Sequence, residues 1–151
     1  MECYSDKYFI NRLSPREKTI HAFCKGKVLE QIDDRSNVIG LIDADPHDPQ
    51  PGLLRNYIRD ELSNGLAILT RRGNPTNKIV ELTPRFENWI IDRVRNNGLS
   101  MNQFGLPETP SELHKIKRID KDQRYHRLID SIIVRDPEMN RIKNVIGEVR
   151  E

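Results

Sequence analysis

The sequence predicts a small α/β protein in which a mainly parallel sheet is flanked by helices and followed by a helical C-terminal third. Short apolar runs alternate with helix-period segments over residues 1–83, as expected for strands joined by right-handed crossovers. One run, 38–42, has no charged residue, as in a strand buried on both faces. From residue 84 onward only helix-period patterns recur. We therefore predict one domain over 1–151, with an α/β core at 1–83 and a helical extension at 84–151.

The first half of the chain is predicted to alternate helices and strands. Ser5 fits the N-cap of a first helix, and strand formers alternate over 19–23. A glycine-containing turn then leads into the second helix. The predicted elements are a helix with Tyr8, Phe9 and Leu13 on one face, a strand at 19–23, a helix carrying Val28, Leu29 and Ile32, the strand 38–42, a helix carrying Leu53, Leu54, Tyr57, Ile58 and Leu62, and strands at 66–69 and 79–82.

The second half is predicted to be helical, and Pro84 opens its strongest helix. That helix ends at Asn97-Gly98, since glycine favours helix C-termini. The stretch 99–110 is predicted to be irregular. The predicted inward-facing residues are Phe86, Trp89, Ile90 and Val94 in the first helix, Leu113 and Ile116 in a short helix capped by Thr109 or Ser111, Tyr125, Leu128, Ile129 and Ile132 in a helix at 123–134, and Val145 and Val149 in a last helix capped by Asp136-Pro137.

The composition fits a globular protein without a large basic surface. Apolar residues make up 36% and charged residues 32% of the chain, and the net charge is +2, so any contact with nucleic acid would have to be local. No apolar run approaches a bilayer span, and the N-terminus has no signal-peptide pattern, so no membrane is expected. Cys3 and Cys24 have no metal-ligand spacing. We expect free thiols and a cytoplasmic protein.

Two carboxylates follow the buried strand. Asp43 and Asp45 stand one residue apart where the apolar run ends, and Pro46 follows. Ligands of open α/β sheets gather beyond the carboxyl ends of the strands, and residues i and i+2 of an extended segment point to one side. The pair could therefore bind a hard cation such as Mg²⁺. The alternative is a structural role, because Asp commonly begins turns and caps helices.

Two segments resemble the motifs of the Toprim (topoisomerase–primase) fold. The segment Glu2-Cys3-Tyr4-Ser5-Asp6 resembles its first motif, Glu-Gly-x-x-Asp, and Asp43-Ala44-Asp45 resembles its second, Asp-x-Asp. The spacing, with a strand and a helix between the motifs, suits a compact Toprim domain, and the resemblance covers residues 1–83. The segment 84–89 is similar to a Pro-x-x-Glu-x-Trp element of some small Toprim-like proteins. The family includes topoisomerases, bacterial primases and overcoming-lysogenization-defect nucleases.

The resemblance implies a Toprim-like Rossmannoid sheet and Mg²⁺- or Mn²⁺-dependent, nuclease-like chemistry on nucleic acid. By position, Glu2 would be the general acid or base, and Asp43 and Asp45 would hold the metal ion. Glu87 would be a further metal ligand, although a carboxylate there also stabilises a helix N-terminus. Divalent ions neutralise the charge that develops on a phosphodiester during attack, so the implied cofactor suits the implied substrate.

Basic residues in two turns are candidates for phosphate contacts. Lys25 and Lys27 flank a glycine at a predicted helix start, where backbone N–H groups and ammonium groups could meet a phosphate. The alternative is a solvated helix start. Arg71 and Arg72 lie in a second basic turn. Three histidines show no metal-ligand spacing and are predicted to be structural: His21, His114 and His126.

Two other functions stay open. Cys3 stands where the Toprim family normally has glycine, and only Met1 precedes Glu2, where the family has its first strand. Both departures favour a non-catalytic Toprim-like binding or regulatory module that works with a partner protein. An unpaired sheet edge could also join two copies in a homodimer. Small-molecule phosphotransfer is less favoured, because the chain has no Gly-x-x-x-x-Gly-Lys loop.

Overall fold

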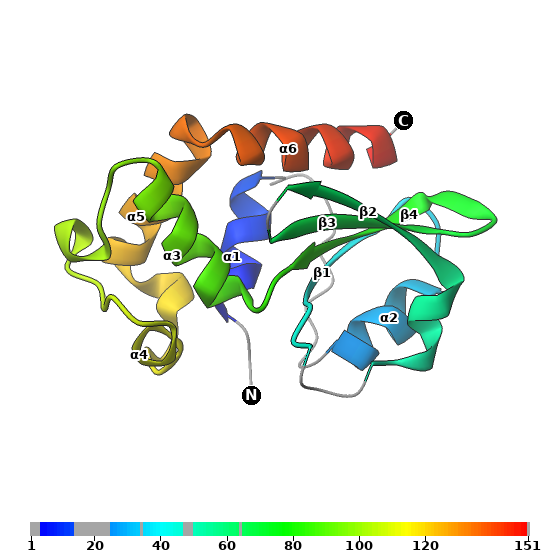
Figure 1. Ribbon diagram of the computed structural model, residues 1–151, viewed down its shortest axis with the longest axis horizontal. Helices are drawn as coiled ribbons and strands as arrows, with labels where there is room; N and C mark the ends of the chain where they lie inside the picture. The colour runs from blue at the N-terminus through cyan, green and yellow to red at the C-terminus, as the bar shows by residue number, and fades with distance from the viewer. Residues whose placement is uncertain (1–3, 14–24, 34, 47–49, 64, 151) are drawn as a thin grey trace.

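A four-stranded sheet with helices on both faces forms the centre of the molecule (Figure 1). The computed structural model describes residues 4–13, 25–33, 35–46, 50–63 and 65–150. The elements are α1 (Tyr4–Leu13), α2 (Lys25–Asp33), β1 (Ile39–Asp43), η1 (Gly52–Asn56), β2 (Tyr57–Ser63), β3 (Leu66–Arg71), β4 (Asn74–Leu82), α3 (Phe86–Asn96), η2 (Met101–Phe104), α4 (Pro110–His114), η3 (Ile119–Lys121), α5 (Gln123–Arg135) and α6 (Pro137–Arg150), where η denotes a 3-10 helix. The predicted α/β class and helical C-terminal part are confirmed.

The sheet is mixed, so the prediction of a mainly parallel sheet is wrong. Its strand order is β1-β4-β3-β2, and only β1 and β4 run parallel, while β2, β3 and β4 form an antiparallel meander. Short connections explain the antiparallel meander, because a two-residue turn can join only antiparallel strands. Gly73, with φ 77°, lies between β3 and β4, and Gly65, with φ 85°, precedes β3. The dipeptide Asn64-Gly65 is a strong hairpin signal, and hydrophobic periodicity alone does not register it.

The predicted helix carrying Leu53, Leu54, Tyr57, Ile58 and Leu62 is also wrong. The chain forms η1 and then the edge strand β2, which pairs with β3 from Tyr57 opposite Arg71 to Ser63 opposite Leu66. The apolar residues that suggested one helix face serve different surfaces: Tyr57 is buried on one side of the sheet, Leu62 packs on the other, and Ile58 is 52% exposed. Backbone pairing with β3 overrides the local periodicity.

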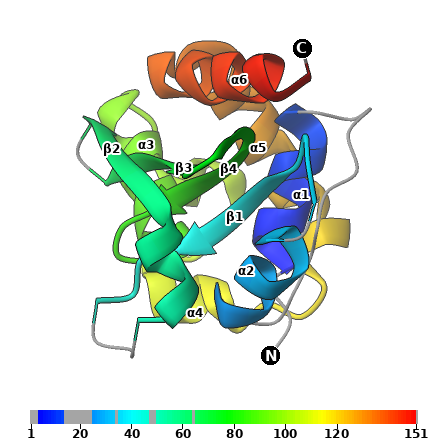
Figure 2. The ribbon, with the colours of Figure 1, turned by 90° about the vertical axis from the view of Figure 1, so that its right-hand side faces the viewer.

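The two faces of the sheet bury separate apolar clusters. On β3, Leu66 and Ile68 pack with α1, α3, α5 and α6, whereas Ala67 and Leu69 pack with α2 on the other face. This alternation follows from the two-residue repeat of a strand. In Figure 2, α2 lies below β1 and α6 lies above the sheet. The larger cluster belongs to the helical side and surrounds Trp89, which is 2% exposed.

The C-terminal helices lie close to their predicted bounds. The helix predicted at 123–134 is α5, and the last helix begins at Pro137, with the Asp136 carboxylate accepting the Glu138 N–H at 2.8 Å. The stretch 99–110, predicted to be irregular, contains η2 with a capping box between Ser100 and Gln103. The strand predicted at 19–23 lies outside the described residues. No helix in the described part of the chain has the length and apolarity that crossing a bilayer requires.

Gly40 allows α2 to pack closely against β1. A Cβ at Gly40 would lie 2.8 Å from Val28 Cγ1 on α2. We therefore expect Gly40→Ala to lower the free energy of unfolding by about 1 to 2 kcal/mol, as overpacking does in well-filled cores. Urea unfolding of Gly40→Ala, Val28→Ala and the double variant measures the coupling. A double variant as destabilised as the sum of both changes would contradict the contact.

Candidate functional site

The end of β1 meets the start of α3. Asp43, the last residue of β1, pairs with Leu82 at the end of β4, and α3 begins four residues further along the chain at Phe86. Beyond the strand, the Ala44 N–H donates to the Leu82 carbonyl at 2.8 Å, and the Asp45 N–H donates to the Pro84 carbonyl at 2.8 Å. These bonds hold the Asp-x-Asp segment alongside the Pro-x-x-Glu segment. The two motifs, far apart in sequence, therefore form one local structure.

The Asp43 carboxylate caps α3 from another element. Its Oδ1 accepts the Phe86 N–H at 2.9 Å, whereas the N-cap residue of α3, Arg85, makes no capping bond with its own side chain. The first N–H groups of a helix lack internal partners, and the helix dipole favours negative charge beside them. This contact gives Asp43 a structural role in addition to any role in binding.

The surroundings of Asp43 disfavour the ionised form of its carboxyl group. Burial raises the pKa of its carboxyl from 3.8 to about 6, and the Glu87 carboxylate is the next largest cause. The Phe86 N–H and the Arg85 guanidinium lower this pKa in part, and Asp45 raises it slightly. The carboxylates predicted from separate motifs thus share one electric field. Because burial is the main cause of the shift, the ionised Asp43 carboxylate is disfavoured mostly by the loss of water around it.

Asp45 reaches this region by a different route from the one predicted. Because β1 ends at Asp43, the expectation that residues i and i+2 of a strand point to one side does not apply. Asp45 has φ 40°, a left-handed conformation that Asp tolerates better than most residues. Its Oδ2 lies 3.3 Å from an Arg85 guanidinium nitrogen. Asp45 therefore lies near Asp43 with its charge partly neutralised by the protein.

Glu87 is held by a histidine that the sequence did not indicate as a site residue. Its Oε1 lies 2.9 Å from His114 Nδ1, and the Glu87 side chain is 9% exposed. His114 ends α4, which the Thr109 hydroxyl caps and the buried Leu113 anchors. No spacing rule links His114 to Glu87, because α3 and α4 approach each other only through their packing. Arg85, also missed, stood between residues of the Pro-x-x-Glu-x-Trp element.

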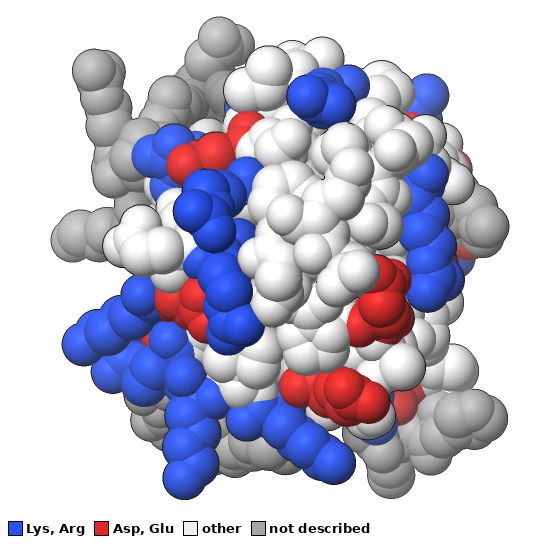
Figure 3. Space-filling view, turned by 90° about the vertical axis from the view of Figure 1, so that its left-hand side faces the viewer, with Lys and Arg blue, Asp and Glu red and all other residues white. Residues whose placement is uncertain are grey.

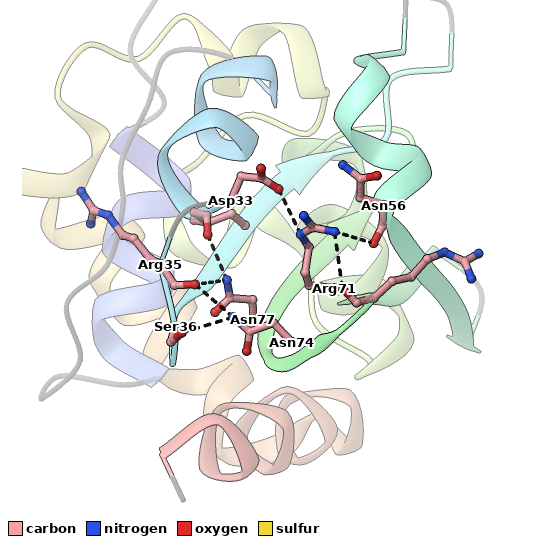
Figure 4. Close-up of polar contacts among 9 residues, drawn as sticks. Asp33, Arg35, Ser36, Asn56, Arg71, Asn74 and Asn77 are labelled. Carbon is pink, nitrogen blue, oxygen red and sulfur yellow. Dashed lines mark hydrogen bonds and ion pairs between the residues drawn. The ribbon is translucent and has the colours of Figure 1, made fainter.

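The predicted phosphate contacts fall at two different ends of the sheet. Arg71 lies at the end of β3 remote from Asp43, with its Nε 3.1 Å from Asp33 Oδ1 and its guanidinium near the Asn56 carbonyl (Figure 4). Arg72 is next to it and exposed. The structure therefore does not bring Arg71 and Arg72 to the carboxylates, and it gives Arg71 a partner within the fold.

Lys25 and Lys27 lie in the first turn of α2. Asn77 of β4 donates to the carbonyl of Ile32 near the end of α2, which fixes that end beside the start of β1. The start of α2 therefore points toward the end of the sheet that holds Asp43. Lys27 is exposed, and its ammonium group lies 3.3 Å from Glu30 Oε2. Glu2 lies outside the described residues, as does the side chain of Lys25.

The residues present suit a magnesium ion in part. Mg²⁺ is commonly held by one or two carboxylates together with water and substrate phosphates. Asp43 and Glu87 offer hard oxygen atoms, and burial together with the Glu87 carboxylate raises the pKa of Asp43. Within the described ranges, no group of at least three His, Cys, Asp or Glu side chains has a metal-binding arrangement. A metal ion at Asp43 and Glu87 would therefore need water and substrate oxygens for most of its ligands.

No known protein helps to assign a function to this group of carboxylates. The Toprim resemblance stays a prediction carried by the residues of the two acidic motifs, and the meeting of Asp43 with Glu87 is an observation on this chain alone. Comparison of the chain with protein-family models, with curated proteins and with solved structures finds no match.

Proposed function

We propose that this protein carries out Mg²⁺- or Mn²⁺-dependent phosphodiester chemistry on nucleic acid, with a nuclease-like activity at the carboxylates of Asp43 and Glu87. The observation that carries the proposal is the junction of β1 with α3, which brings Asp43, Asp45 and Glu87 to one end of the sheet. Carboxylates are the usual protein ligands of the metal ions that act on phosphate esters.

Each side chain has a defined part in this proposal. Asp43 and Glu87 would hold the metal ion, and the His114 ring keeps the Glu87 carboxylate in place. When bound, the ion supplies charge neutralisation and orientation of the phosphate oxygens. In hydrolysis, a water oxygen bonds to phosphorus, the bond from phosphorus to one sugar oxygen breaks, and that oxygen leaves with a proton. The Toprim resemblance assigns the proton transfer to Glu2.

The test combines metal titration with turnover. We expect calorimetry to detect Mg²⁺ or Mn²⁺ binding to the wild type, and we expect Asp43→Asn and Glu87→Gln to lose it together with cleavage of labelled DNA or RNA, single-stranded or duplex. Asp92→Asn is the matched control, because Asp92 is an exposed carboxylate on the same helix. Cleavage that survives both substitutions, or that proceeds unchanged in EDTA, would refute the assignment.

A binding or regulatory module is the second candidate. It is favoured by the contacts that the carboxylates already make, since Asp43 caps α3 and Asp45 pairs with Arg85. For this module we expect metal or nucleic-acid binding without turnover on any substrate. A partner protein would then be needed for the chemistry. Wild-type turnover in purified protein excludes this candidate.

A further inference from the structure

Three exposed lysines follow the histidine that contacts Glu87. Lys115, Lys117 and Lys121, called the lysine patch below, lie between α4 and α5, and each is exposed. Figure 3 shows the side of the molecule that is on the left in Figure 1, where Lys and Arg side chains gather toward the lower left with Asp and Glu side chains beside them. The net charge of the chain is only +2, so its composition does not reveal this local group of positive charges.

Neighbouring arginines already neutralise the aspartates of this segment. Arg118 lies 2.7 Å from an Asp120 carboxylate oxygen, and Arg124 lies 2.7 Å from an Asp122 carboxylate oxygen. Hydrogen bonds from these guanidinium groups lower the pKa of both carboxyls. Among the residues that the structure describes, no ion pair is found for the three lysines. The charge of Lys115 and Lys117 is therefore available to an external anion, while Lys121 also lies close enough to Asp120 to lower the pKa of that carboxyl.

The fold fixes the patch next to the candidate site. Lys115 directly follows His114, whose ring contacts Glu87 at 2.9 Å. Leu113 and Ile119, 1% and 5% exposed, anchor the backbone on either side of Lys115 and Lys117. A chain fixed at both ends holds its lysines at a constant place relative to the carboxylates. A polyanion bound along the patch would thus extend toward Glu87.

We infer that the lysine patch binds the sugar-phosphate backbone of the nucleic-acid strand whose phosphodiester bond reaches Asp43 and Glu87; this inference rests on the proposed function. Lysine ammonium groups contact phosphates without reading base sequence, so the patch would set position and affinity. An anionic membrane is less favoured, because lipid-binding surfaces also present apolar side chains. Ile116 is half-buried and Ile119 is buried, and the large apolar residues found exposed in the described part, Ile58 and Val134, lie elsewhere.

The test measures how nucleic-acid binding depends on salt, in EDTA so that no turnover occurs. Fluorescence anisotropy with labelled DNA and RNA, single-stranded and duplex, compares the wild type with Lys115→Gln/Lys117→Gln/Lys121→Gln. The matched control is Arg35→Gln/Arg135→Gln/Lys143→Gln, which removes the same charge from exposed positions away from the patch. Thermal unfolding checks that each variant is folded.

We expect the patch variant to lose about 2 to 3 units of the slope of log K against log salt, and to bind roughly 10- to 500-fold more weakly at about 0.1 M salt. The control variant should keep most of the salt-dependence slope and most of the binding affinity. Equal slopes for patch variant and wild type would overturn the inference, as would a wild type that binds anionic vesicles but no nucleic acid. Metal titration of the patch variant separates the two proposals. If this variant keeps metal binding but loses affinity for nucleic acid, the result supports binding by the lysine patch. If the wild type binds no metal, the result counts only against the proposed metal site at Asp43 and Glu87.

Discussion

Asp43→Asn is expected to unfold at a higher temperature than the wild type at about pH 8 in the absence of divalent metal. The wild-type carboxyl has a pKa of about 6 in the folded state against 3.8 ordinarily, so its ionisation disfavours folding. An asparagine removes that charge, and its Oδ1 can still accept the Phe86 N–H. We expect a gain on the order of 2 kcal/mol, or roughly 4 to 8 °C, as measured by calorimetry.

The pH dependence has a definite sign. Because the folded-state pKa of Asp43 is raised, its contribution to stability is full below about pH 4 and is lost as the pH rises through about 6. The difference between the wild type and Asp43→Asn should therefore grow over this interval and level off above it. Asp92→Asn, on the exposed surface of α3, is the matched control for the loss of one carboxylate. A variant less stable than the wild type at about pH 8 would mean that the ionised carboxylate matters chiefly as the cap of α3.

Divalent metal should reverse the ranking. Mg²⁺ that binds the folded wild type stabilises it in proportion to the logarithm of its concentration, and Asp43→Asn should lack this gain. A residue that weakens the metal-free fold yet is needed for the metal-bound form is the pattern expected at a functional site. Equal responses of the wild type and the variant to Mg²⁺ would assign Asp43 a structural role alone.

Asp136→Ala is expected to be the most destabilising of these substitutions, by about 3 kcal/mol or more in urea unfolding. Asp136 is 2% exposed, and its carboxylate accepts the Asn97 side-chain N–H and the Glu138 N–H, both at 2.8 Å. Its Oδ1 also lies 3.7 Å from Arg93. Alanine would remove the cap of α6 and leave a half-buried guanidinium and a carboxamide with fewer partners.

This carboxylate matters for the site because it holds the far end of α3. Asp43 contacts the first residue of that helix, and Asp136 contacts Asn97 just beyond its last turn. Asp136→Asn is the matched variant, since its oxygen can still cap α6, and we expect about half the loss. A combined Arg93→Met/Asp136→Ala variant should be less destabilised than the sum of its changes, and simple additivity would show that the pair does not interact.

Helices and strands whose sequence pattern lies within one short segment could be predicted from the sequence. The apolar run 38–42 became β1 with Asp43 at its end, and Pro84 preceded a helix whose apolar stripe, including Trp89 and Ile90, is buried. These features could be predicted because side-chain periodicity and turn chemistry act over a few residues. The candidate carboxylates could be named for the same reason, since each belongs to a short motif.

Tertiary structure decided the features that depend on distant segments. Segment 57–63 became a strand because β3 offered it a backbone partner, although its apolar spacing suited a helix. Arg71 lies at the end of β3 remote from Asp43 and pairs there with Asp33, and the packing of α4 on α3 brings His114 to Glu87. Sequence patterns within one segment cannot predict these contacts, because each contact forms when two elements bury their apolar faces together. The sequence by itself thus determined which residues carry charge at the ends of elements, and packing determined which of those charges meet.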